Sequence, residues 1–276
     1  MRKIHPYELY PGLCSRYDLR ELKDRFRLID FIVVDLDECV FPGFSQTYLG
    51  ILVALRLLTN PERFFDIKFL LSLFKGGIFI TLIKIKSVFN IKTSNLELLN
   101  KYEQIMKGIP LSYFEWAAQK IPALSFPYCF DTLKVLAKKA PLGIISLGTD
   151  IVLAQYEKTL NKESKIISFF SSNHLVFEDY NTRKVFVGYD RSRFYWSGIQ
   201  KEEILRYKMK EFKKNFPLII GHNIDDIPMV QLAKQKNGLG IGFNPSLKDF
   251  KFFDIVVRKR SWAPLNRLIN NLMKEE

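Results

Sequence analysis

The sequence has few cysteines, three in 276 residues (Cys14, Cys39 and Cys129), and this excludes a disulfide-rich scaffold. Their spacing contains no C-x-x-C pair, which also argues against a cysteine-based metal module. The first thirty residues lack the apolar segment of a secretory signal. The apolar stretches between residues 48 and 91 are interrupted by charges before they reach the ~18–20 residues that a membrane-spanning helix needs. We therefore expect a cytoplasmic protein, with attachment to a membrane surface left open.

The composition is that of a folded chain with a basic excess. Hydrophobic residues make up 47% and aromatic residues 14%, which is ample apolar surface for a core and excludes intrinsic disorder. The length allows one large domain or two modest ones. The 42 lysines and arginines outnumber the 29 acidic residues, giving a net charge of +13. This excess suits three partners: nucleic acid, an anionic membrane surface, or a small phosphorylated substrate.

Strand and helix patterns alternate over most of the chain. The predicted buried strands are continuous apolar runs that end in polar residues, at 31–37, 141–150 and 216–223. The predicted helices are at 129–139, 150–161 and 200–214. This alternation is typical of an α/β fold with a doubly wound, mostly parallel sheet.

Two segments depart from this alternation. Residues 43–125 are mostly apolar at helical spacing, with breaks at Asn60-Pro61, Gly76-Gly77 and 108–110, and we interpret them as a helical insertion after the first strand. Residues 171–189 alternate apolar and polar side chains around a turn at 179–182, which predicts a β-hairpin.

Residues capable of chemistry follow each of the three predicted strands. Ligands of open parallel sheets bind beyond the carboxyl ends of the strands, so these residues are expected to share one edge. They are Asp35 and Asp37 after the first strand, Ser146 and Thr149 at the second, and His222, Asp225 and Asp226 after the third.

Asp35 and Asp37 are the strongest of these candidates. Strand alternation directs both carboxylates to one side, where their repulsion requires a cation or a shared proton. A magnesium ion, which prefers oxygen ligands, would relieve the repulsion. One aspartate could then attack phosphorus to form an aspartyl-phosphate, and the other could protonate the leaving alkoxide. Without further support, the pair could equally be two solvated acids at a strand end.

The remaining candidates are weaker when each is taken alone. Ser146 could bind a phosphoryl oxygen, although serine after a strand is usually a turn residue. Lys201 could neutralise a phosphoryl group, although a solvated surface lysine is the default in so basic a chain. Asp225 and Asp226 could complete a metal site or simply cap a helix.

In chain order these motifs form one pattern: Asp-Leu-Asp, then Ser146, then Lys201, then G-x-x-x-D-D-x-P-M. The pattern resembles the haloacid-dehalogenase (HAD) superfamily, and most nearly its phosphoserine-phosphatase-like branch. Residues 171–179, 238–246 and 254–257 resemble further segments of that branch. The resemblance covers residues 31–42 and 126–257. It implies a HAD-like core from residues 1–42 and 126–276, with residues 43–125 as an inserted helical cap that closes over the site.

The resemblance also implies a role for each matching residue. Asp35 would be the nucleophile, and Asp37 the general acid and base. Ser146 would bind the phosphoryl oxygens, and Lys201 would steady the aspartyl-phosphate. Magnesium would be held by Asp35, by Asp37 through its backbone carbonyl, and by Asp226, which matches the second acid of the motif G-D-x-x-x-D.

Two residues depart from that pattern. His222 stands where the first acid of the motif would ligate the metal, and imidazole is a poor magnesium ligand. We expect Asp225 to compensate as a further metal ligand. Cys39 replaces the usual threonine after Asp37, and we expect it to be buried and unreactive because no histidine or cysteine partner is evident. His5 and His174 have no partner pattern, and we expect structural roles for both.

Basic and aromatic residues are interleaved in the predicted cap. The sequence between residues 56 and 92 has two acidic residues and seven basic ones: Arg56, Arg63, Lys68, Lys75, Lys84, Lys86 and Lys92. They could fringe an apolar face that lies in a membrane interface, or belong to helices packed in the ordinary way. Nucleic acid is the least favoured partner, because no recognition motif and no concentrated basic run is present.

Three functions follow from this pattern. The leading prediction is a magnesium-dependent phosphomonoester hydrolase with an aspartyl-phosphate on Asp35 and a small phosphorylated substrate. One alternative is a binding or regulatory protein that keeps the fold and has lost metal competence at His222. Another is a phosphatase of lipid phosphates at a membrane surface.

Overall fold

An eight-stranded sheet forms the centre of the protein in the computed structural model, which describes residues 4–59 and 94–274. The strand order is β1-β2-β10-β9-β8-β3-β4-β5. All pairs from β10 to β5 are parallel, and the β1–β2 and β2–β10 pairs are antiparallel. The strands are β1 Tyr7–Tyr10, β2 Leu13–Ser15, β3 Phe31–Val34, β4 Leu142–Thr149, β5 Ile167–Asn173, β8 Pro217–Gly221, β9 Leu239–Phe243 and β10 Ile255–Val257.

The three predicted strands are neighbours in this sheet, as β8, β3 and β4. Val34 of β3 pairs with Ile144 of β4 on one side and with Ile220 of β8 on the other. The carboxyl ends of the three strands therefore meet at one edge. The predicted α/β fold with a mostly parallel sheet is confirmed.

Helices cover both faces of the sheet. Alternate residues of β3 contribute to two different apolar clusters: Ile32 and Val34 to one, Phe31 and Val33 to the other. Full burial of such a side chain contributes ~1.5–3 kcal/mol. The first cluster includes α1 Leu19–Leu28, α6 Cys129–Lys139, α7 Asp150–Leu160 and α10 Ala263–Leu272, and the second includes α8 Gly198–Glu211 and α9 Ile227–Gln235.

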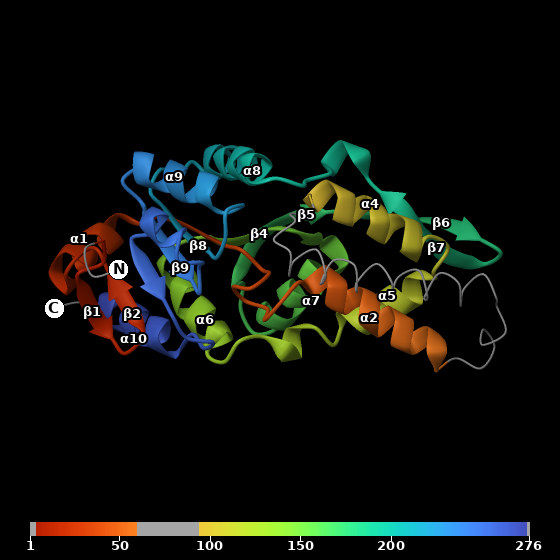
Figure 1. The fold of residues 1–276 in the computed structure, drawn as a ribbon, viewed down its shortest axis with the longest axis horizontal. Coiled ribbons are helices and arrows are strands. Elements are labelled where there is room, and N and C mark those ends of the chain that lie inside the picture. Colours follow the sequence, from red (N-terminus) through yellow and green to blue (C-terminus); the bar gives the residue numbers. More distant parts are fainter. Residues whose placement is uncertain (1–3, 60–93, 275–276) are drawn as a thin grey trace.

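The segment after β3 supplies three described helices, α2 Ser45–Leu58, α4 Asn95–Met106 and α5 Leu111–Ala118. Figure 1 shows them gathered at the end of the molecule opposite the two chain termini. The predicted hairpin is confirmed as β6 Leu175–Tyr180 and β7 Arg183–Tyr189.

The hairpin β6–β7 packs on these inserted helices. The Phe114 ring of α5 lies 5.3 Å from that of Phe177 and 5.5 Å from that of Phe186, measured between centroids. A bridge between Pro110 and Val185 adds backbone pairing. The interior of this end of the molecule therefore combines residues from two distant parts of the chain.

The histidines without a predicted partner have contacts that suit structural roles. His5 is buried, and its Nε2 atom lies 2.9 Å from the carbonyl oxygen of Phe253. The Nδ1 atom of His174 lies 3.1 Å from Oδ2 of Asp150.

Within the described ranges, no helix combines the length and the apolar composition required to cross a bilayer. Most of the basic and aromatic residues on which the membrane-surface prediction depends, those between 60 and 93, lie outside the described residues. That prediction therefore stays a prediction.

Candidate active site

Asp35 lies directly beyond the carboxyl end of β3, in the centre of the sheet. Its backbone N–H donates to the carbonyl oxygen of Ile220, 2.9 Å away, which continues the pairing with β8 by one residue. The chain then turns sharply, because the carbonyl of Leu36 accepts from the N–H groups of Val40 and Phe41. Asp35 is 2% exposed, so its negative charge requires partners within the protein.

Lys201, in the first turn of α8, is one of those partners. The Ser197 hydroxyl and carbonyl accept from the N–H groups of Gln200 and Lys201, which fixes the start of the helix. The Lys201 Nζ atom lies 2.8 Å from Oδ1 of Asp35 and 2.7 Å from Oδ1 of Asp226. Burial lowers the pKa of Lys201, but the two carboxylates outweigh burial and raise it overall. Lys201 is therefore a cation held between two buried carboxylates.

Asp226 is positioned by the loop after β8. Its Oδ2 accepts from the backbone N–H of His222 at 2.8 Å and of Asn223 at 3.3 Å. A Cβ on Gly221 would lie 2.5 Å from Cβ of Asp226, closer than real Cβ atoms approach, so only glycine allows this side chain to lie against the strand end. Burial raises the pKa of Asp226, but Lys201 and His222 outweigh burial and lower it.

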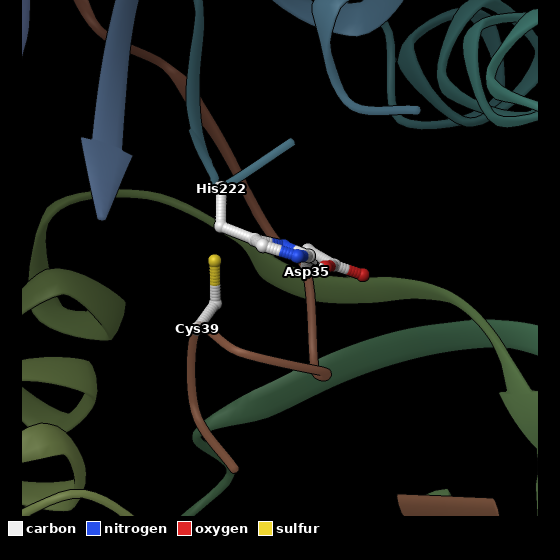
Figure 2. A group of neighbouring side chains, drawn as sticks. All are labelled: Asp35, Cys39 and His222. Atoms are coloured by element: carbon white, nitrogen blue, oxygen red, sulfur yellow. Dashed lines mark hydrogen bonds and ion pairs between the residues drawn. The ribbon is translucent and has the colours of Figure 1, made fainter. Parts of the chain in front are cut away.

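His222 contacts the same two carboxylates from the other side. Its Nδ1 atom lies 3.3 Å from Oδ2 of Asp35 and 3.5 Å from Oδ2 of Asp226. Figure 2 shows the ring reaching the Asp35 carboxylate. Burial lowers the pKa of the imidazole, but contacts with the two carboxylates and the Cys39 thiol outweigh burial and raise it well above its usual range.

The expectation that Cys39 has no histidine partner is wrong. The ligand atoms of Asp35, Cys39 and His222 lie within 4.8 Å of one another, and the thiol points toward His222 in Figure 2. Cys39 is buried, as expected, and burial raises the pKa of its thiol to about 12 despite the nearby imidazole. The Cys39 carbonyl accepts from Nε1 of Trp262, 2.8 Å away, which fixes the turn after β3.

Asp37 lies two residues after Asp35, in the turn that follows β3. Its Oδ1 accepts from the backbone N–H of Ser45 at the start of α2, 2.7 Å away. Burial and the negative charge of Asp35 raise the pKa of Asp37 to about 6. A carboxyl group with this pKa can exchange a proton near neutral pH, as a general acid and base must.

Hydroxyl groups line the adjacent end of β4. A Cβ on Gly148 would lie 3.0 Å from Oγ of Ser45, 3.2 Å from Oγ of Ser146 and 3.9 Å from Oδ2 of Asp37, so these oxygens surround the glycine. Ser146 is buried and accepts from the N–H of Gly148 at 3.0 Å. Within the described chain, the buried Ser45 Oγ and Thr149 Oγ1 have no hydrogen-bond partner. The Ser45 hydroxyl, which lies on the same side of Gly148 as Asp37, could donate to an anionic ligand there.

The Asp225 carboxylate contacts the segment that follows β3. Its Oδ2 accepts from Nδ2 of Asn95, at the start of α4, at 3.1 Å, and the same amide donates to the carbonyl of Trp196. Asp225 thus links the loop after β8 to an inserted helix. Its role as a compensating metal ligand stays a prediction that no contact here supports.

A magnesium ion fits these residues poorly. Magnesium requires near-octahedral coordination by oxygen atoms, whereas both carboxylate oxygens of Asp35 and of Asp226 already face a nitrogen of Lys201 or His222. Among the described residues, side-chain ligand atoms cluster at Asp35, Cys39 and His222, and two of these three offer nitrogen or sulfur rather than oxygen. The predicted magnesium set of Asp35, Asp37, Asp225 and Asp226 therefore stays a prediction.

Three contributors to the site were not predicted from the sequence: Ser45, Asn95 and the contact of Cys39 with His222. Ser45 follows Pro42-Gly43-Phe44 and begins an apolar helical run, so a helix start could have been recognised there. The other two depend on how distant segments pack, and the sequence carries no local signal for them.

Comparisons with known proteins bear on the fold of the chain. No protein-family profile and no curated protein sequence matches the chain. Among solved structures, a phosphoserine phosphatase in its apo form is similar with a TM-score of 0.61 and 17% identity, over 87% of this chain and 98% of the other. A HAD family hydrolase from Salmonella enterica serovar Typhi gives 0.62 and 17%, over 92% and 79%.

A cytosolic 5'-nucleotidase IIIB bound to cytidine gives a TM-score of 0.66 and 16% identity, over 99% of this chain and 97% of the other. These three structures have the same α/β core. Sequence identities of 16–17% establish a shared fold and nothing finer. The protein therefore has the fold of HAD-superfamily phosphatases.

Proposed function

We propose that the protein is a phosphomonoester hydrolase that forms an aspartyl-phosphate on Asp35. The observation that carries the proposal is the position of Asp35: a buried carboxylate at the carboxyl end of the central strand, 2.8 Å from the Lys201 ammonium. Ligands of parallel sheets bind at this edge. The phosphatases and nucleotidase with the same fold support a phosphorylated substrate.

In the first step an oxygen of Asp35 attacks phosphorus, and the bond from phosphorus to the leaving alcohol breaks. Asp37 gives its proton to the departing alkoxide, which its pKa of about 6 allows. Lys201 opposes the negative charge on the phosphoryl group, and the hydroxyls of Ser45 and Ser146 donate to its oxygens. The products of this step are the alcohol and aspartyl-phosphate.

In the second step Asp37, now ionised, takes a proton from water as that water attacks phosphorus. The bond between phosphorus and Asp35 breaks, releasing inorganic phosphate and regenerating the carboxylate. Asp37 regains its proton in this step, so the cycle closes without another acid.

Hydrolysis of a generic aryl phosphate tests this proposal. We expect Asp35→Asn to lower kcat/KM by on the order of 10⁴-fold or more, because the nucleophile is removed. Asp179→Asn, on the exposed hairpin, is the matched control and should keep full activity. An Asp35→Asn variant as active as the parent protein would refute the proposal.

A protein that binds phosphoryl groups without hydrolysing them is the second candidate, and the contact of His222 with Asp35 favours it. It would bind inorganic phosphate, with binding weakened by Ser146→Ala, and would turn over no member of a panel of amino-acid, sugar, nucleotide and lipid phosphates. Turnover confined to the lipid phosphates would support the membrane-surface alternative.

A further inference from the structure

The carboxylates of Asp35 and Asp226 are bridged twice. Lys201 joins their Oδ1 atoms, at 2.8 and 2.7 Å. The Nδ1 atom of His222 joins their Oδ2 atoms, at 3.3 and 3.5 Å. The His222 ring therefore occupies the side of the two carboxylates that Lys201 does not contact.

The direction of these contacts follows from the chemistry of the acceptors. An ionised carboxylate can only accept hydrogen bonds, so the Nδ1 atom facing two carboxylates carries a hydrogen whether the ring is neutral or charged. A nitrogen that donates has no lone pair for a metal ion. The backbone N–H of His222 and that of Asn223 add two further donors to Oδ2 of Asp226.

The positive groups around the two carboxylates also weaken the attraction for a divalent cation. The two buried carboxylates are opposed by the Lys201 ammonium, and His222 replaces an acidic residue in the pattern that the sequence resembles. An ion such as Mg²⁺ would meet no preformed cage of oxygen ligands, because both carboxylate oxygens of Asp35 and of Asp226 already face a nitrogen.

We propose that His222 takes the place of a divalent cation at Asp35, so that phosphoryl binding and transfer proceed without a bound metal. The ring holds Asp35 and Asp226 together through its Nδ1 atom, on the side of the pair opposite Lys201. The claim that phosphoryl transfer needs no metal rests on the proposed function. The claim that the site binds no magnesium rests on the contacts of Asp35, Asp226, Lys201 and His222 alone.

Titration calorimetry with MgCl₂ tests the binding part directly. The parent protein is expected to give no binding heat at millimolar magnesium. His222→Asp, which supplies a carboxylate in place of the donor, is expected to gain saturable magnesium binding. His222→Asn is the matched control, since it removes the imidazole without adding a charge, and should gain none.

Magnesium binding by the parent protein would overturn the inference, as would a folded His222→Asp variant that binds no magnesium. Circular dichroism establishes that each variant is folded, and if His222→Asp does not fold, the parent titration still decides. Titration with Co²⁺ tests the opposite possibility, a transition-metal site at Asp35, Cys39 and His222. Such a site would give a thiolate-to-cobalt absorption band that Cys39→Ser abolishes. That band would contradict a metal-free centre.

Activity separates this inference from the proposed function. Hydrolysis by the parent protein should be unchanged by EDTA, whereas hydrolysis by His222→Asp should fall at least about tenfold with EDTA, a change of ~1.4 kcal/mol in activation free energy. Loss of parent activity in EDTA, restored by magnesium, would overturn the inference. If neither protein hydrolyses any phosphate, the proposed function fails, and the calorimetric contrast still tests the inference.

Discussion

The Nδ1 atom of His222 lies 3.3 Å from Oδ2 of Asp35, on the side of the carboxylate opposite Lys201. The nucleophile proposed here is thus held between two nitrogen groups that come from different elements, the loop after β8 and the first turn of α8. Each of these contacts has a measurable consequence for stability or activity.

Removal of the Lys201 ammonium should destabilise the protein. In Lys201→Met the carboxylates of Asp35 and Asp226 lose a shared buried cation, and leaving such charges unpaired costs ~3–5 kcal/mol. Urea denaturation measures the loss. Arg206→Met, on the same helix, is the control: Arg206 is 52% exposed and pairs with Glu202, so its loss should cost at most ~1 kcal/mol. Equal losses in the two variants would contradict a buried bridge.

Replacement of Asp37 should affect substrates according to their leaving groups. Asp37→Asn lacks the proton donor, so hydrolysis of an alkyl phosphate should fall by ~10²–10⁴-fold. An aryl phosphate, whose phenolate leaves without protonation, should lose much less kcat/KM, because this constant reports the first step and not the second, in which Asp37 is the base. A steady-state comparison of both substrates checks this, and equal losses would show that Asp37 does not act as the acid.

The pH dependence of kcat/KM should report the same group. Burial and the charge of Asp35 raise the pKa of Asp37 to about 6, so its carboxyl holds the required proton below that pH and loses it above. We expect kcat/KM for an alkyl phosphate to fall as pH rises through about 6. The second ionisation of a phosphate group also lies near pH ~6, so the Asp37→Asn profile serves as the reference. Identical profiles for the two proteins would count against this assignment.

Asp225 and Asp226 should differ in their importance although they are adjacent. Asp226→Asn weakens the contacts to Lys201 and His222, and we expect activity to fall by ~10²–10³-fold. Asp225→Asn removes a charge that faces Asn95, so the loss should stay below about tenfold. Comparable losses would instead support the sequence-based prediction that Asp225 ligates a metal.

Trp262 should stabilise the turn that carries the site. Trp262→Phe leaves the buried carbonyl of Cys39 without its donor, which costs ~1–3 kcal/mol. Trp116→Phe, on the partly buried helix α5, makes the same chemical change without that hydrogen bond. Thermal unfolding should show a larger loss for Trp262→Phe, and equal losses would mean that the hydrogen bond contributes nothing.

The central strands could be predicted because each is a continuous apolar run that ends in polar residues. The predicted 141–150 corresponds to β4 Leu142–Thr149, and the predicted helix 129–139 to α6 Cys129–Lys139. The hairpin of β1 and β2 was not predicted, because its strands of four and three residues are too short for a clear pattern. Its pairing with β10, more than 200 residues later in the chain, leaves no local signal.

Asp35, Lys201 and Asp226 could be predicted as candidates, because each follows a recognisable strand or opens a recognisable helix. Which of them touch could not be predicted, since contact depends on the packing of α8 and of the loop after β8. His222 and Cys39 are 183 residues apart in sequence and meet only because β3 and β8 are neighbours. Two departures from the family pattern that look independent in the sequence are thus a single contact in the structure.

The most direct test of this account is the site of phosphorylation during turnover. The protein is mixed with an aryl phosphate in EDTA, quenched in acid within milliseconds, digested and analysed by mass spectrometry. The account predicts an acid-stable phosphoryl group on the peptide that contains Asp35, absent from the Asp35→Asn variant. A phosphoryl group on Ser146 or Cys39 instead, or turnover with no phosphorylated peptide at any quench time, would contradict it.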